Sequence, residues 1–253
     1  MAIDDRQGKN LNKMDLSASY IRWNSWDSEP FASLNKTMRG SFDAEIKKTG
    51  RKLPVGSNVL EVGFGNGGFL RYAEEKNWCV TGTEINEILV SRAAESGFHV
   101  ICESDLSNLK GDNYDLIVAF DVLEHIPQED LPSFFKKVQR LLKEDGSFIA
   151  RFPNCDSPFG LKNQYGDITH VSAIGAGKAR WLCAVANLQI CSLSGEALPI
   201  IGVKWRHKIH RLIANPIKAM TNFCVNLIFY PRSPVEFTAI NLVLVCQKCK
   251  HTT

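Results

Sequence analysis

The chain has 253 residues, 44% of them hydrophobic and 23% charged, with a formal net charge of +3. This length can bury the core of one α/β domain, and no charge-free apolar run reaches the roughly 18 residues that predict a membrane span. The polar N-terminus predicts no secretory signal, and eight cysteines lying mostly in apolar runs favour a reducing, cytoplasmic compartment.

Apolar runs of strand length alternate with helical stretches in the first half of the chain. Residues 1–50, a polar segment with aromatic and helical stretches, are expected to form an N-terminal helical lid. The expected strands are then 57–63, 78–84, 99–103, 114–120 and 146–152, and the expected helices are 67–76, 86–96 and 128–143. Such alternation is typical of a parallel sheet covered by helices on both faces.

The second half is less regular. We expect a loop over 153–177, a helix over 178–187 and a strand over 188–193. A long helix over 205–229, broken at Pro216, and a strand over 236–246 complete the chain.

A glycine-rich turn follows the first expected strand, in the sequence VLEVGFGNGGFL. Glu61 closes the strand, and Gly63, Gly65, Gly67 and Gly68 lead into a helix. Glycine permits both a tight turn and the close approach of a ligand to the backbone. Dinucleotide-binding proteins use a similar turn, but with a hydrophobic residue in the place of Glu61. The spacing instead resembles the first motif of class I S-adenosylmethionine-dependent methyltransferases.

Three further motifs follow in order at strand ends. Glu84 closes the second strand, where a carboxylate can accept hydrogen bonds from both ribose hydroxyls. Asp105 follows the third strand, at the position that meets the adenine amino group in this family. The sequence YDLIVAFDVLEHIP, residues 114–127, resembles the fourth methyltransferase motif. Ligand sites in open α/β sheets lie at the carboxyl ends of strands, so all four motifs are expected at one edge.

The resemblance implies S-adenosylmethionine as cofactor and S-adenosylhomocysteine as product. Residues 26–46 are similar to the segment before the first motif in ubiquinone-biosynthesis O-methyltransferases, and Arg39 matches an arginine that grips the cofactor's carboxylate there. The alternative for Arg39 is an ordinary surface arginine. The expected cofactor-binding residues are Arg39, Glu61, Gly63, Phe64, Gly65, Gly67, Glu84, Ile85, Asp105, Leu106, Phe120, Asp121 and Val122.

The catalytic residues are expected close to the same edge. Residues 167–190 resemble a segment in methyltransferases of surface-polysaccharide gene sets, and His170 there is the first choice for a general base. His170 could instead pair structurally with Asp167. His125 and Asp121 are the other catalytic candidates. Asp121, Glu124 and His125 carry oxygen and imidazole groups that can bind a divalent metal. Cys246 and Cys249 have the spacing of a zinc-binding pair, but no second pair accompanies them. No metal site is expected at either place.

The resemblance implies a Rossmann-like, seven-stranded, mostly parallel sheet whose last two strands are antiparallel. We expect a single domain over 1–253, with a cofactor-binding core at 51–151 and an acceptor-side region at 152–253. The expected reaction is O-methylation of a sugar in a surface polysaccharide or lipid-linked glycan. A phenolic or quinone-type acceptor, a non-catalytic partner protein and an NAD-dependent oxidoreductase are the alternatives, and a nucleic-acid substrate is not expected.

An insertion at 204–230 departs from the family pattern. Its apolar residues recur at helical spacing with basic residues among them, and residues 204–253 contain eight Lys or Arg against one acid, Glu236. A basic amphipathic helix can bind an anionic membrane surface, which would make the protein peripheral at the inner face of the membrane. The alternative is a helix that packs in the core or in a homodimer.

Overall fold

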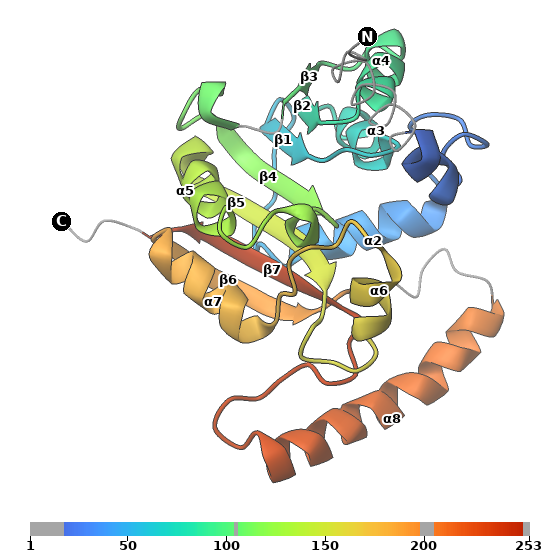
Figure 1. Ribbon diagram of the computed structural model, residues 1–253, viewed down its shortest axis with the longest axis vertical. Coiled ribbons are helices and arrows are strands. Elements are labelled where there is room, and N and C mark those ends of the chain that lie inside the picture. Colours follow the sequence, from blue (N-terminus) through green and yellow to red (C-terminus); the bar gives the residue numbers. More distant parts are fainter. Residues whose placement is uncertain (1–17, 104–105, 198–204, 250–253) are drawn as a thin grey trace, which may run out of the picture.

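The computed structural model describes residues 18–103, 106–197 and 205–249, and its centre is one seven-stranded sheet (Figure 1). The strand order is β3-β2-β1-β4-β5-β7-β6. The strands are β1 (Asn58–Val62), β2 (Cys79–Glu84), β3 (Val100–Cys102), β4 (Tyr114–Phe120), β5 (Leu142–Pro153), β6 (Leu188–Gly195) and β7 (Asn241–Lys248). Strands β1 to β5 pair in parallel, while β7 runs antiparallel to both β5 and β6. The expected Rossmann-like, mostly parallel sheet is confirmed.

The helices are α2 (Lys36–Lys47), α3 (Gly68–Glu75), α4 (Glu87–Glu95), α5 (Leu131–Leu141), α6 (Leu161–Gly166), α7 (Ala176–Val185) and α8 (Trp205–Phe229), with 3-10 turns η1 (Leu106–Asn108) and η2 (Leu123–His125). Side-chain caps begin two of them. Asn35 accepts a hydrogen bond from the backbone N of Met38 at 2.9 Å, and Asn86 accepts one from the N of Ile88 at 3.1 Å.

Alternating strand residues supply two separate cores, one on each face of the sheet. In β1, Leu60 packs in the cluster that includes α5 and α7, while Val59 packs in the cluster that includes α2 and α3. In β4, Ile117 packs in the cluster with α5 and α7, and Val118 packs in the cluster with α2 and α3. Each face of a strand is therefore buried by helices, which explains the continuous apolar runs in the sequence.

Two expectations for the second half are wrong. The expected loop at 153–177 contains helix α6, which begins after Gly160 and ends at Gly166. Six residues are too few to show the periodic apolar pattern by which a helix is predicted. Helix α8 continues through Pro216 without the expected break. It lies between β6 and β7 in sequence and apart from the sheet in space (Figure 1).

Candidate cofactor and acceptor site

The glycine-rich turn joins β1 to α3 in a left-handed backbone path. Gly63, Gly65 and Gly67 have φ angles of +67°, +52° and +75°, which side chains with a Cβ rarely adopt. A Cβ on Gly63 would lie 2.6 Å from Cγ2 of Val122, which follows β4. The carboxyl ends of β1 and β4 thus meet at this turn, as expected.

Glu84, at the end of β2, reaches the same turn. Its Oε2 accepts a hydrogen bond from the backbone N of Gly65 at 3.1 Å. Its Oε1 accepts from the backbone N of Ile85 at 2.8 Å and of Asn86 at 3.1 Å. Each carboxylate oxygen has two lone pairs, so the group can still accept a hydrogen bond from a bound hydroxyl.

Glu61 is a buried acid behind the turn. It is 4% exposed, and its Oε2 has no hydrogen-bond partner among the described residues. Burial raises the pKa of Glu61 well above its usual value, and the nearby carboxylate of Glu84 raises it further. A bound ammonium group would supply both the missing donor and a compensating charge. Glu61 therefore fits a cofactor that carries an amino group, as the methionine part of S-adenosylmethionine does.

Aromatic side chains from the N-terminal segment lie over the turn. A Cβ on Gly65 would lie 2.9 Å from Cη2 of Trp26, and one on Gly67 would lie 2.5 Å from Cζ of Phe31. Trp26 is held by an edge-to-face contact with Tyr20, with ring centroids 5.8 Å apart. This segment covers the turn in the manner of the expected lid. Trp26 and Phe31 were not singled out in the sequence, where only the cluster of aromatic residues could have indicated them.

The structure does not bring Arg39 to the turn. Its guanidinium donates to both carboxylate oxygens of Glu75, with Nε to Oε2 at 2.8 Å. Glu75 ends α3, whereas the glycine turn precedes the first residue of that helix, about 10 Å away at 1.5 Å per residue. In this structure Arg39 therefore pairs with Glu75 at the surface, and its contact with the cofactor's carboxylate stays a prediction.

Three other expected cofactor residues lie in three different surroundings, and their contacts with the cofactor stay predictions. The side chain of Leu106 is 1% exposed and packs in the hydrophobic core on the face of the sheet covered by α5, so it does not face solvent. Phe120 stacks on Phe42 of α2 with ring centroids 5.6 Å apart, on the opposite face. Ile85 is 71% exposed beside Glu84 and presents an apolar surface. Asp105 lies outside the described residues.

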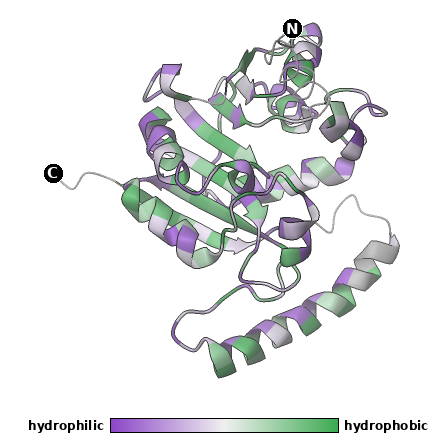
Figure 2. Ribbon diagram, viewed as in Figure 1, coloured by the Kyte–Doolittle hydropathy of each residue, from purple (hydrophilic) through white to green (hydrophobic). Residues whose placement is uncertain are grey.

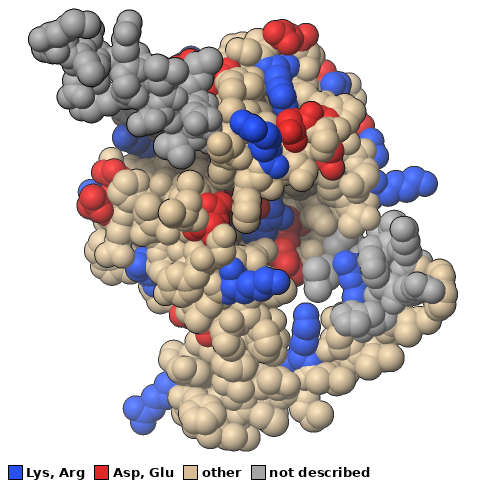
Figure 3. Space-filling view, turned by 45° about the vertical axis from the view of Figure 1, so that its right-hand side comes forward, with Lys and Arg blue, Asp and Glu red and all other residues tan. Residues whose placement is uncertain are grey.

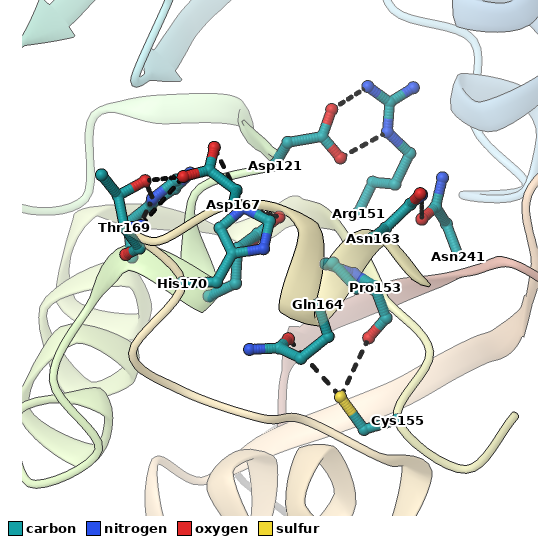
Figure 4. A network of polar contacts seen from close by, with 12 residues as sticks. Asp121, Arg151, Pro153, Cys155, Asn163, Gln164, Asp167, Thr169, His170 and Asn241 are labelled. Carbon is teal, nitrogen blue, oxygen red and sulfur yellow. Dashed lines mark hydrogen bonds and ion pairs between the residues drawn. The ribbon is translucent and has the colours of Figure 1, made fainter. Parts of the chain in front are cut away.

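Asp121 follows β4 and pairs with Arg151 of β5 (Figure 4). The guanidinium donates to both carboxylate oxygens, with Nε to Oδ1 at 2.9 Å. Asp121 has a φ of +57°, an uncommon conformation for a residue with a side chain. Because two charge-assisted hydrogen bonds fix the carboxylate, Asp121 is better suited to shaping this loop than to accepting a proton.

Two histidines meet next to this loop and form, with Glu124, Asp167 and Thr169, the histidine cluster. The rings of His125 and His170 are 4.6 Å apart. Nε2 of His170 lies 4.0 Å from Oε1 of Glu124 and 3.8 Å from Oδ2 of Asp167. Thr169 Oγ1 donates to Oδ1 of Asp167 at 2.6 Å and lies 3.0 Å from Nδ1 of His125 (Figure 4). Both of the histidines expected from the sequence are thus in one cluster.

Burial alters the proton affinity of the histidine cluster. Glu124 is 1% exposed, and burial, with Asp121 nearby, raises its pKa to about 8. Burial and the neighbouring His170 lower the pKa of His125. Oε2 of Glu124 and Nδ1 of His170 have no partner among the described residues. The cluster therefore contains a buried ring nitrogen without a partner among the described residues, Nδ1 of His170, and carboxyl groups lie near Nε2 of the same ring.

The same cluster has the composition of a divalent-metal site. One ligand atom each from Glu124, His125 and His170 lies within 4.8 Å of the others. A carboxylate with two imidazoles can bind several transition metals. Burial raises the pKa of Glu124 to about 8, so binding of a cation here would have to displace the proton of this carboxyl group.

A family model described as a methyltransferase domain matches residues 34–193, a range that includes the glycine turn and the histidine cluster. The chain belongs to this methyltransferase family. No curated protein matches the sequence.

Solved structures share the fold of this methyltransferase. A SAM dependent methyltransferase from Archaeoglobus fulgidus is 20% identical, with a TM-score of 0.59 over 83% of this chain and 94% of that one. A putative sarcosine dimethylglycine methyltransferase from Galdieria sulphuraria is 18% identical, with a TM-score of 0.59 over 92% of this chain and 98% of that one. The [4+2]-cyclase SpnF is 16% identical, with a TM-score of 0.59 over 93% and 95%. Since one fold carries different chemistries, the acceptor must be argued from the site.

Proposed function

We propose that the protein is an S-adenosylmethionine-dependent O-methyltransferase that acts on a sugar hydroxyl of a surface polysaccharide or lipid-linked glycan. One observation carries the proposal: the unpartnered Nδ1 of His170 belongs to a ring whose Nε2 lies 4.0 Å from the buried carboxyl group of Glu124. A hydroxyl oxygen must lose its proton as it takes up a methyl group, so O-methylation needs a base. The choice of a sugar rests on the resemblance of residues 167–190 to polysaccharide methyltransferases.

Residues around the glycine turn would hold the cofactor. Glu84 would accept a hydrogen bond from a ribose hydroxyl, Glu61 would accept one from the amino group, and exposed Ile85 would offer an apolar surface to the adenine ring. When bound, the cofactor supplies a methyl group that its sulfonium already activates. The chain mainly has to align the acceptor and exclude water, and Trp26 and Phe31 already lie against the turn, where they shield it from solvent.

The histidine cluster would handle the proton. The acceptor hydroxyl gives its proton to Nδ1 of His170, and the resulting imidazolium is stabilised by the carboxylate of Asp167, whose Oδ2 lies 3.8 Å from Nε2. Thr169 fixes the carboxylate of Asp167 by a hydrogen bond from its hydroxyl. Arg151 fixes Asp121 and thereby the loop that leads to Glu124.

Transfer of a labelled methyl group tests the proposal. The purified chain is incubated with methyl-labelled S-adenosylmethionine and a panel of hexose and deoxyhexose glycans, with catechols as the phenolic alternative. Labelled glycan ethers, lost in the His170→Ala variant, are the expected result. Labelling of catechols alone would replace the sugar by a phenol. Calorimetric binding of S-adenosylmethionine without transfer to any acceptor would favour the non-catalytic partner, and binding of NAD instead would contradict the cofactor.

A further inference from the structure

Helix α8 turns its polar face toward the body of the protein and its apolar face outward. The partly buried residues of α8 lie on one face, which we call the inner face: Arg211, Ala214, Lys218, Thr221, Asn222, Val225 and Asn226. Most of these side chains are polar. A surface helix of a soluble protein normally buries its apolar stripe and exposes its polar one.

The outer face of α8 is apolar and exposed. It consists of Leu212, Ile213, Pro216, Ile217, Met220, Phe223, Cys224, Leu227 and Ile228. Leu212, Met220 and Phe223 are 68%, 65% and 66% exposed, and no residue of the stretch Arg211–Phe229 is fully buried. At about 100° per residue these positions span close to half of the helix circumference. Figure 2 shows hydrophobic residues along this helix, which lies apart from the sheet. A continuous apolar stripe of this size indicates an interaction surface.

Specific hydrogen bonds hold the inner face to the rest of the chain. Oδ1 of Asn226 accepts from the backbone N of Val235 at 2.8 Å, and its Nδ2 donates to the O of Val235 at 3.0 Å. Asn222 accepts from the backbone N of Thr238 at 2.9 Å. These bonds hold the side of α8 that carries Asn222 and Asn226 against the chain. The apolar residues lie on the opposite side of the helix and therefore face outward.

Charge indicates what covers the outer face. No Asp or Glu occurs between Glu196 and Glu236, while this stretch contains six Lys or Arg residues: Lys204, Arg206, Lys208, Arg211, Lys218 and Arg232. Figure 3 shows a hollow between α8 and the body with Lys and Arg side chains on its walls. Two copies joined through α8 would bring two acid-free basic segments together, whereas anionic lipid head groups complement them.

We propose that α8 docks the protein onto an anionic bilayer, with its outer face in the lipid interface and its inner face toward the body. The stretch Arg211–Phe229 is long and apolar enough to cross a membrane by length and composition. The hydrogen-bonded asparagines and Lys218 on one side, opposite a purely apolar side, are instead typical of a helix that lies in the interface plane. This inference is independent of which acceptor is methylated.

Vesicle flotation with the full-length protein tests the docking. The vesicles are phosphatidylcholine alone or phosphatidylcholine with phosphatidylglycerol, at low and high salt. We expect flotation with the anionic vesicles, weakened by salt, and little with phosphatidylcholine alone. Met220→Asp places a charge on the outer face and should reduce the bound fraction about tenfold, since a carboxylate is poorly tolerated among acyl chains. Asn215→Asp adds the same charge to an exposed position off the outer face and is the matched control.

Four results would overturn the proposal. The first is absence of flotation while the protein still binds S-adenosylmethionine and therefore is folded. The second is a dimer in lipid-free solution that Met220→Asp dissociates, which would assign the outer face to a second copy. The third is equal loss of flotation in Met220→Asp and Asn215→Asp, which would mean that net charge alone governs binding. Resistance of the vesicle-bound protein to alkaline carbonate would indicate a spanning helix and would contradict the interfacial position.

Discussion

The carboxylate of Glu84 and the backbone N of Gly65 are joined by a 3.1 Å hydrogen bond between the end of β2 and the glycine turn. A single side chain thus links the turn that would carry the cofactor to the strand end that would fix its ribose. We expect Glu84→Ala to weaken S-adenosylmethionine binding by about 1–3 kcal/mol, through loss of charge-assisted hydrogen bonds. Calorimetry measures this, with exposed Glu87→Ala in the first turn of α4 as control. Equal affinity of the two variants would remove Glu84 from the site.

Gly65 combines a left-handed φ of +52° with the close approach of Trp26. Gly65→Ala should abolish measurable cofactor binding, because its Cβ would enter the space at the turn. Gly97→Ala separates the two effects, since Gly97 has a φ of +86° and nothing within 4 Å of a Cβ. We expect the control to lose about 1–2 kcal/mol of unfolding free energy with normal affinity. Loss of affinity in both variants would mean that backbone strain, not space at the turn, governs binding.

Sequence reasoning succeeded where the chemistry depends on neighbours along the chain. The turn at residues 63–68 and the acids that close β1 and β2 could be predicted because strand ends and glycines are local signals. Contacts between distant side chains could not. Nothing local in the sequence reveals that Arg39 pairs with Glu75 or that Asp121 pairs with Arg151, and the role of Arg39 toward the cofactor stays a prediction. Periodicity predicted α8 as an amphipathic helix, but only the bonds of Asn222 and Asn226 show which face is outward. The division into one domain stays a prediction.

His170 should be required for turnover but not for cofactor binding. His170→Ala is expected to lower kcat about 10²- to 10⁴-fold with unchanged affinity for S-adenosylmethionine, because it removes the proton acceptor alone. His99→Ala, an exposed histidine whose Nδ1 lies 3.2 Å from Thr81, is the control and should keep full activity. If His170→Ala retains full turnover, the base lies elsewhere, and His125 is the next candidate to test.

Metal removal distinguishes a proton acceptor from a metal ligand in the histidine cluster. We expect methyl transfer to be unchanged after prolonged dialysis against EDTA, since the sulfonium already activates the methyl group and the proposed base is a histidine. Recovery of a lost activity by Mg²⁺, Mn²⁺ or Zn²⁺ would instead assign Glu124, His125 and His170 as ligands. Titration of the protein with each ion, followed by calorimetry, gives the same answer without an acceptor.

The contribution of Glu124 to the free energy of unfolding should fall as the pH rises. Burial raises its folded-state pKa to about 8, above the value near 4.5 of an exposed glutamate, so between these values the folded state binds more protons than the unfolded state. The contribution of Glu124 to the free energy of unfolding should therefore decrease from about pH 4.5 to about pH 8, by at most roughly 1.4 kcal/mol per pH unit. Glu124→Gln cannot ionise and should flatten this slope in urea unfolding series, while Glu129→Gln, at an exposed position, should keep it. A slope that is identical in the wild-type chain and Glu124→Gln would show that Glu124 is ionised in the folded protein at neutral pH, and would return the histidine cluster to consideration as a cation site.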